Sequence, residues 1–334
     1  MEPGTRRESN SQNRTKRKPG ANYLRYTENN KKSLLSCACS LICKTMKMTE
    51  KNYRLLDYMD EMLHSIFFLG YIHKLRLAPE TFFKGTETVT GAKEMFPRPF
   101  EMYKSHLPTR TPFSILLDMM EIIHDTEENI LTKLQKLLEK LKFPPPLHKP
   151  GNTYEQFYSL ESTVICVCYL DSDPQRYYGA SLSCRKGNAK RILIDVSCLK
   201  TWHELVSHAV MSFYPEGPGD GITFPTSVKC QAYFRDSNGY NKRGPCYKCH
   251  QLFNLRDPDP GKGDHPYGNC AEAECLSKLL LINPYIQEET LMENHTEENL
   301  QNLRRLTTAR LTEQLQKVDI QMNDENILFY SPMQ

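Results

Sequence analysis

Three consecutive prolines divide this sequence into two parts with different patterns of apolar residues. The prolines Pro144, Pro145 and Pro146 lie within the segment 143–151. Proline has no backbone N–H and its ring clashes with the preceding turn, so such a run cannot continue a helix. It favours an extended spacer instead. We therefore expect a linker at 143–151, with separately folded regions on its two sides.

The part before the linker has the apolar periodicity of helices. Segments 53–75 and 113–141 repeat Leu, Ile, Met and Phe at intervals of three and four residues, which predicts amphipathic helices. Asp125 or Thr126 is suited to begin a new helix within the second segment. We expect residues 31–142 to form a helical region with a Met- and Leu-rich core, and this region could bind a protein partner.

Two segments of the amino-terminal half lack this periodicity. Residues 76–112 are rich in Pro, Thr and Gly, which predicts a long loop. Residues 1–32 contain nine Lys or Arg and three Glu, whereas the whole chain has a net charge of only +3. With few apolar side chains, residues 1–30 are predicted to be a disordered basic tail. The basic cluster at 16–18 is compatible with a nuclear address, a nucleic-acid contact or a plain solvated tail.

The sequence carries no signal for export. Its first twenty residues are polar and charged, without the apolar centre of a secretory signal. No apolar run reaches the roughly 20 residues of a membrane span. We expect a cytoplasmic or nuclear protein that is not secreted and has no membrane partner.

After the linker, strand and helix patterns are mixed. Strands are predicted at 163–169, 177–184, 191–196 and 227–234, the second and third joined by a turn at 185–188, and helices at 202–213, 247–253 and 271–281. This mixture predicts a layered domain of the α+β or α/β class at 152–290. A carboxy-terminal segment, 291–334, contains a further polar helix at 296–318.

Two short segments carry chemistry. The chain has twelve cysteines, which in a protein that is not secreted are expected to be reduced. Cys246 and Cys249 form a Pro-Cys-x-x-Cys motif, in which a tight turn lets two thiolates reach one ion and a following helix stabilises their charge. Cys270 begins a predicted helix, and Glu272 follows two positions later. We predict one zinc ion held by Cys246, Cys249 and Cys270, with the Glu272 carboxylate nearby and not a ligand.

The sequence does not determine what occupies the fourth coordination position of the metal. Water there makes the site catalytic, whereas His265, His250 or Cys275 as fourth ligand would close it and make it structural. Cys275 is expected to point into the core, since it lies roughly 140° around a helix from Cys270. Four other cysteines are expected to be small core residues: Cys166, Cys168, Cys184 and Cys198.

The two motifs resemble those of the zinc-dependent cytidine and nucleobase deaminases. That signature is His or Cys, any residue, then Glu, together with Pro-Cys-x-x-Cys. The resemblance covers two segments of about ten residues, and the motifs occur here in the reverse of the usual order. It implies a cytidine-deaminase-like domain with Zn²⁺ as cofactor, Cys246, Cys249 and Cys270 as ligands, and Glu272 as the proton shuttle. The implied substrate is a nucleobase, a nucleoside or a nucleic acid.

Two other functions fit the same residues. A non-catalytic protein-interaction protein would use its zinc to hold the carboxy-terminal domain together. A nucleic-acid-binding protein would use the basic tail. Four side chains that flank the motifs could stack on a base or simply pack: Tyr247, His250, His265 and Tyr267.

Overall fold

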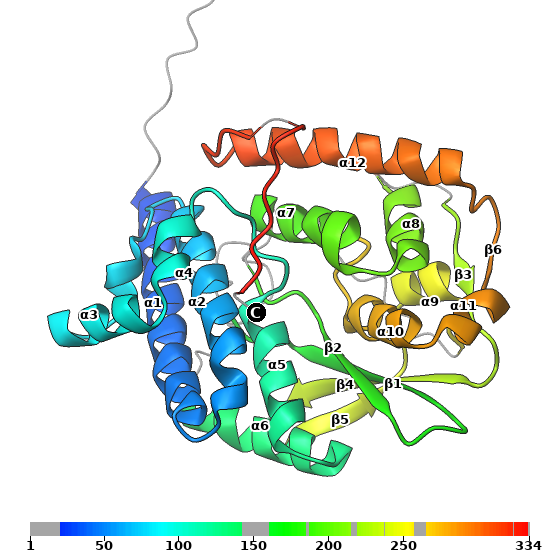
Figure 1. Cartoon of the computed structure of the whole chain (residues 1–334), viewed down its shortest axis with the longest axis horizontal. Helices are drawn as coiled ribbons and strands as arrows, with labels where there is room; N and C mark the ends of the chain where they lie inside the picture. Colours follow the sequence, from blue (N-terminus) through cyan, green and yellow to red (C-terminus); the bar gives the residue numbers. More distant parts are fainter. Residues whose placement is uncertain are drawn as a thin grey trace, which may run out of the picture.

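Helices enclose a small antiparallel sheet in this chain. The computed structural model describes residues 21–141, 160–184, 187–214, 219–236, 238–256, 265–322 and 324–332. Within these ranges the fold is α+β, as predicted, with a helical region preceding a four-stranded sheet (Figure 1). The expected linker at 143–151 and the basic cluster at 16–18 lie outside the described residues.

The prediction of a helical amino-terminal region is confirmed. It consists of α1 (Ala21–Thr49), α2 (Leu56–Tyr71), α3 (Thr86–Met95), α4 (Pro97–Met102), α5 (Pro112–Ile123) and α6 (Glu127–Leu141), with 3₁₀ turns at Tyr53–Leu55 and Pro79–Phe82. The second periodic segment is divided into α5 and α6, and Thr126 Oγ1 accepts a hydrogen bond from Asn129 N at the start of α6. No helix in the described ranges is long and apolar enough to cross a membrane.

Two expectations for this region are wrong. Residues 21–30, expected to be disordered, instead form the beginning of α1, which starts at Ala21. Packing of its Leu34 and Leu41 in the core stabilises a helix that polar composition alone disfavours. The loop expected at 76–112 contains α3 and α4, and Pro97 lies in the first turn of α4, where proline is tolerated because the N–H it lacks would have no helical partner.

The sheet has the order β2-β1-β4-β5, with antiparallel neighbours throughout. Its strands are β1 (Val164–Leu170), β2 (Arg176–Ala180), β4 (Val228–Asp236) and β5 (Gly239–Arg243), and a separate short pair joins β3 (Ile222–Thr223) to β6 (Leu291–Met292). Cys168 lies opposite both Tyr177 on β2 and Cys230 on β4. This register positions one of the thiol groups described below.

The strand predicted at 191–196 is wrong. These residues belong to α7 (Asn188–Val196), which continues through a π-helical turn at Ser197–Thr201. Gly187, with φ of +94°, precedes the helix and does not close a hairpin. The buried Asp195 forms an ion pair with Arg310 of α12 (Glu297–Gln316). Contacts with this distant helix stabilise α7 against its local strand preference.

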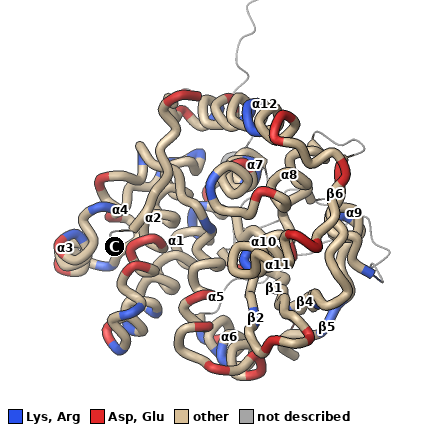
Figure 2. The backbone as a smooth tube through the Cα atoms, turned by 45° about the vertical axis from the view of Figure 1, so that its right-hand side comes forward, with Lys and Arg blue, Asp and Glu red and all other residues tan. Residues whose placement is uncertain are grey.

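The helices predicted after the sheet's first strands are confirmed. They are α8 (Glu204–Ser212), α9 (Tyr247–Phe253), α10 (Ala271–Ile282) and α12, with α11 (Pro284–Glu289) following α10. Helix α10 packs on β1 and β2, and α12 lies along α7 and α8 (Figure 1). Figure 2 shows acidic and basic residues mixed along α12.

The two faces of the sheet belong to two apolar cores. Successive side chains of a strand point to opposite faces. Ile165 and Val167 of β1 face a core shared with α1, α2, α5 and α6, whereas Cys166 and Cys168 face a core shared with α8, α9 and α10. The sheet is therefore the middle layer between the amino-terminal helices and the helices that carry the metal motifs.

A network of buried charges joins the two sides. Arg110 forms ion pairs with Glu61 of α2 and Asp118 of α5. Lys278 of α10 lies 2.6 Å from Asp118 and 3.5 Å from Glu274. Helix α10 is thus held to the amino-terminal region by charges as well as by apolar contacts.

The carboxy-terminal segment returns to the first helices. Tyr330 is 2% exposed and stacks on the His64 ring at a centroid distance of 3.7 Å. Its hydroxyl donates to the Asp60 carboxylate, and its backbone N–H donates to Leu107 O. This tyrosine therefore covers the part of α2 that carries Asp60 and His64.

Candidate metal centre

Each of the two predicted motifs lies at the beginning of a helix. Cys246 immediately precedes α9 and Cys270 immediately precedes α10, both with extended backbone angles. The first N–H groups of a helix have no intrahelical acceptor, and they carry the positive end of its dipole. Both thiols therefore lie where negative charge is stabilised.

Gly268 is required for the turn that carries Cys270. Its φ is +80°, in the left-handed region that favours glycine. A Cβ at this position would lie 2.8 Å from Val210 Cγ1 and 3.1 Å from Ile194 Cγ2. The turn can therefore pack against α7 and α8 only with glycine at this position.

The structure brings the three predicted zinc ligands together. Cys246 Sγ lies 3.5 Å from Cys249 Sγ and 3.4 Å from Cys270 Sγ, and Cys249 Sγ lies within 4.8 Å of Cys270 Sγ. Zinc–sulfur bonds of about 2.3 Å in a tetrahedron separate two sulfurs by about 3.8 Å. The spacing of these thiols fits one ion.

The protonation of the thiols is unequal. Hydrogen bonding with Cys249 and Cys270 holds the pKa of the Cys246 thiol well below its usual range. Burial raises the pKa of the Cys249 thiol well above its usual range. The hydrogen bond with Cys246 likewise raises the pKa of the Cys270 thiol well above its usual range. A metal ion must therefore displace protons from at least two of the three groups.

Glu272 is buried beside these thiols. It is 3% exposed, and a carboxylate oxygen lies within 4.8 Å of the Sγ atoms of Cys249 and Cys270. Burial, and then the charge of Cys230, raises its pKa to about 8. Its Oε2 has no hydrogen-bond partner among the described residues. Since a buried polar atom without a partner is costly, a polar group bound here would satisfy it.

The three candidates for a fourth ligand differ in position. His265 Nδ1 and Nε2 lie 3.8 and 3.9 Å from Cys270 Sγ, and a ring nitrogen also lies within 4.8 Å of Cys246 Sγ. His250 Nδ1 lies instead 2.7 Å from Leu255 O. Cys275 belongs to a second group of thiols, on the core side of α10. Of these candidates, His265 is the one placed beside Cys246 and Cys270.

Comparisons with protein-family models, with curated proteins and with solved structures found no match.

The aromatic side chains near the motifs divide into packed and exposed ones. Tyr267 stacks on Phe213 with a centroid distance of 4.8 Å, and its hydroxyl donates to Gln251 Oε1 at 2.7 Å. Lys248 Nζ lies 4.7 Å from the same ring centroid. Tyr267 is therefore a packing residue, whereas Tyr247 is 41% exposed.

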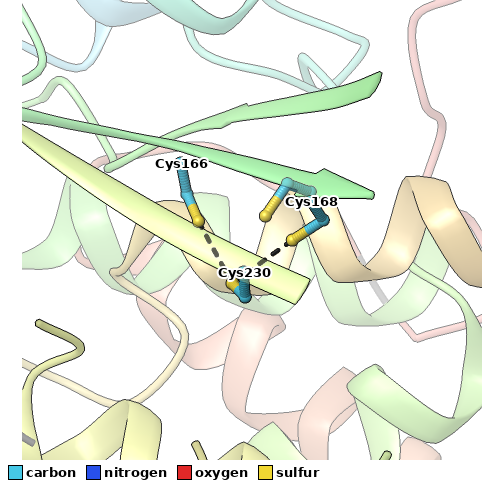
Figure 3. A group of neighbouring side chains, drawn as sticks. Cys166, Cys168 and Cys230 are labelled. Carbon is cyan, nitrogen blue, oxygen red and sulfur yellow. Dashed lines mark hydrogen bonds between the residues drawn. The ribbon is translucent and has the colours of Figure 1, made fainter. Parts of the chain in front are cut away.

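Sequence reasoning missed a second cysteine group. Cys166, Cys168, Cys230 and Cys275 bring their Sγ atoms within 4.8 Å of one another, and Figure 3 shows the first three side chains converging. Cys166 and Cys168 are buried, as predicted, yet they are not isolated core thiols. The signal was the Cys-x-Cys spacing within a strand, which places both thiols on one face. Buried Cys198 belongs to neither group.

Proposed function

We propose that this chain is a zinc-dependent hydrolytic deaminase acting on a nucleobase, in a nucleoside or a nucleic acid. The observation that carries the proposal is the position of Glu272. Its carboxylate is 3% exposed, lies within 4.8 Å of the Cys249 and Cys270 thiols, and has one oxygen without a hydrogen-bond partner among the described residues. A closed structural site has no use for a buried acid there, whereas hydrolysis needs a proton acceptor beside the metal's open position.

Cys246, Cys249 and Cys270 would hold the ion. Zinc bound there would lower the pKa of a bound water to about 7. In hydrolytic deamination the water oxygen adds to the ring carbon that bears the amino group, the carbon–nitrogen bond breaks, and ammonia leaves. Glu272 would carry a first proton from the water to the ring nitrogen. It would then carry the second proton, released as the added hydroxyl becomes a carbonyl, to the departing amine.

The test compares two charge-removing variants of the full chain. Ammonia release is measured with cytosine and adenine nucleosides and with single-stranded oligonucleotides. Glu272→Gln is expected to lower the rate by about 100-fold or more, with unchanged zinc content. The matched control is Glu288→Gln, because Glu288 is exposed on α11, and it is expected to retain full activity. An active Glu272→Gln protein, or a zinc-loaded wild type inactive on every substrate, contradicts the proposal.

A second candidate function is favoured by His265. Its ring nitrogens, 3.8 and 3.9 Å from Cys270 Sγ, are close enough to complete a closed Cys₃His site. In that case zinc would join the turn carrying His265 to α9 and α10, and the chain would act as a protein-interaction protein with the amino-terminal helices as its binding region.

Replacing the two neighbouring histidines separates the two functions. If His265 is the fourth ligand, His265→Ala weakens zinc binding by more than about tenfold and lowers the melting temperature. If the position is open, His265→Ala retains the zinc. His250→Ala is the control, since His250 contacts Leu255 O and not the thiols. Zinc affinity is measured by competition with a chromogenic chelator.

A further inference from the structure

Four cysteines from three elements meet between the sheet and α10. Cys166 and Cys168 come from β1, Cys230 from β4 and Cys275 from α10. Cys230 Sγ lies 3.2 Å from Cys166 Sγ and 3.3 Å from Cys168 Sγ (Figure 3). All four sulfurs lie within 4.8 Å of one another.

We propose that these four cysteines bind a second zinc ion in a closed tetrahedral site. Tetrahedral zinc with bonds of about 2.3 Å separates its sulfurs by about 3.8 Å. The observed separations are 3.2 and 3.3 Å for two pairs and at most 4.8 Å for the others, a range that includes this value. Each thiol gives up its proton when it binds the ion. Four protein ligands leave no position for water, so this ion is structural.

The backbone fixes this arrangement. Cys166 and Cys168 are two residues apart on a strand and so share a face, and Cys168 is directly paired with Cys230. On β2, Gly179 is paired with Cys166, and a Cβ at Gly179 would lie 2.6 Å from Cys275 N. The glycine lets α10 approach the sheet closely enough for Cys275 to join the other three.

A disulfide, an iron–sulfur cluster and plain core packing account less well for the four thiols. A disulfide holds two sulfurs about 2.05 Å apart, whereas Cys230 is nearly equidistant from Cys166 and Cys168. An iron–sulfur cluster occupies the centre of its ligands and keeps its cysteines further apart than a single ion does. Core packing accounts for one buried cysteine, such as Cys198, but not for four sulfurs around one point.

The second site bears on the first through α10. Cys270 immediately precedes this helix and Glu272 lies in its first turn. Cys275 lies three residues after Glu272, and its Sγ is 3.5 Å from Glu272 O. An ion held by Cys275 and the sheet would pin α10 against β1 and β4. It would thereby fix the position of the Glu272 carboxylate, although the two sites share no ligand.

The test is the zinc content of the full-length protein and of two double variants, measured by elemental analysis and native mass spectrometry. Wild type is expected to hold two zinc ions. Cys246→Ser with Cys249→Ser is expected to retain one, and X-ray absorption of that protein should give four sulfurs at about 2.3 Å. Cys168→Ala with Cys230→Ala is expected to lose this ion. Cys198→Ala, a buried cysteine outside both groups, is the control and retains both ions.

The double variant Cys246→Ser with Cys249→Ser is sufficient to test the second site. Its result stands even if Cys168→Ala with Cys230→Ala does not fold. One zinc with four sulfur ligands supports the second site, whatever the occupancy of the first. No zinc in the variant lacking Cys246 and Cys249, with a wild-type circular dichroism spectrum, overturns it. Fewer than four sulfurs around the retained ion, or iron in its place, overturns it as well.

Discussion

Gly179 on β2 packs directly against Cys275 on α10. A Cβ on Gly179 would lie 2.6 Å from Cys275 N and 3.1 Å from Cys275 Cβ. Real Cβ atoms do not approach a backbone nitrogen this closely. Gly179→Ala must therefore push α10 away from the sheet, and we expect a loss of about 3 kcal/mol in the free energy of unfolding. Urea denaturation followed by circular dichroism measures this loss.

A second glycine provides the control for that experiment. Gly91 lies within α3, and a Cβ there has no neighbour within 4 Å among the residues that the structure describes. Gly91→Ala is expected to stabilise the protein by about 0.5–1 kcal/mol, because alanine has the higher helix propensity. Equal effects of the two substitutions would mean that β2 and α10 are not in close contact.

Removing Arg110 tests the buried charge network. The side chains of Arg110, Glu61 and Asp118 are only 19%, 7% and 14% exposed, so Arg110→Met leaves two carboxylates in the interior with reduced compensation. We expect a loss of about 3–5 kcal/mol, measured by chemical denaturation. Arg76→Met is the control, because the ion pair of Arg76 with Asp319 is exposed, and its loss should change stability by less than about 1 kcal/mol. A small effect at Arg110 would show that Lys278 alone balances the network.

The raised pKa of Glu121 predicts that the stability of the folded protein depends on pH. Burial, and then the charge of Asp118, raises its pKa from 4.5 to about 7. The folded state therefore favours the protonated acid, and stability is lost as the pH rises from about 4.5 to about 7 and the group ionises. Glu121→Gln removes this loss, so the variant should be more stable than wild type above pH 7, by about 2 kcal/mol after allowance for solvent screening.

Denaturation of both proteins across that pH range checks the prediction. The difference between Glu121→Gln and wild type should be close to zero at the acid end, grow as the pH rises, and become constant above about pH 7.5. A difference that is independent of pH would assign the effect to packing and not to ionisation.

Removal of bound metal should lower the melting temperature. Without an ion, the thiols of Cys246, Cys249 and Cys270 no longer join α9 to α10. We expect a strong zinc chelator to lower the melting temperature by roughly 5–10 °C, in a thermal scan followed by intrinsic fluorescence. Added Zn²⁺ should restore it and Mg²⁺ should not, because thiolates favour soft ions. An unchanged melting temperature in the chelated, zinc-free protein would contradict a stabilising role.

Local signals made the grouping of Cys246, Cys249 and Cys270 predictable. Pro245 before Cys246, and glycine and asparagine before Cys270, are motif features that need no tertiary information, and the helices predicted at 247–253 and 271–281 correspond to α9 and α10. The position of His265 was less predictable. It depends on how the turn before Cys270 folds against α7 and α8, through contacts with residues such as Val210.

Distant contacts account for what local patterns did not reveal. Cys166 and Cys230 are 64 residues apart, and their meeting depends on the pairing of β1 with β4, which no local pattern specifies. Residues 191–196 have the composition of a strand, but they form a helix. This helix packs on α12, and Asp195 forms an ion pair with Arg310, which lies 115 residues later. At 191–196 tertiary structure therefore overrides local preference, whereas at the cysteines it adds a pairing that the local sequence does not encode.

The burial of Tyr330 against His64 also determines when the chain can finish folding. Tyr330 and its partner Asp60 are 270 residues apart, so at about 5–20 residues per second a ribosome needs roughly 15–50 s between making one and the other. Throughout that interval the His64 face of α2 lacks the cover that Tyr330 supplies in the folded chain. Covering of this face of α2 is therefore a late event in synthesis, and a nascent chain stalled before residue 330 would expose it.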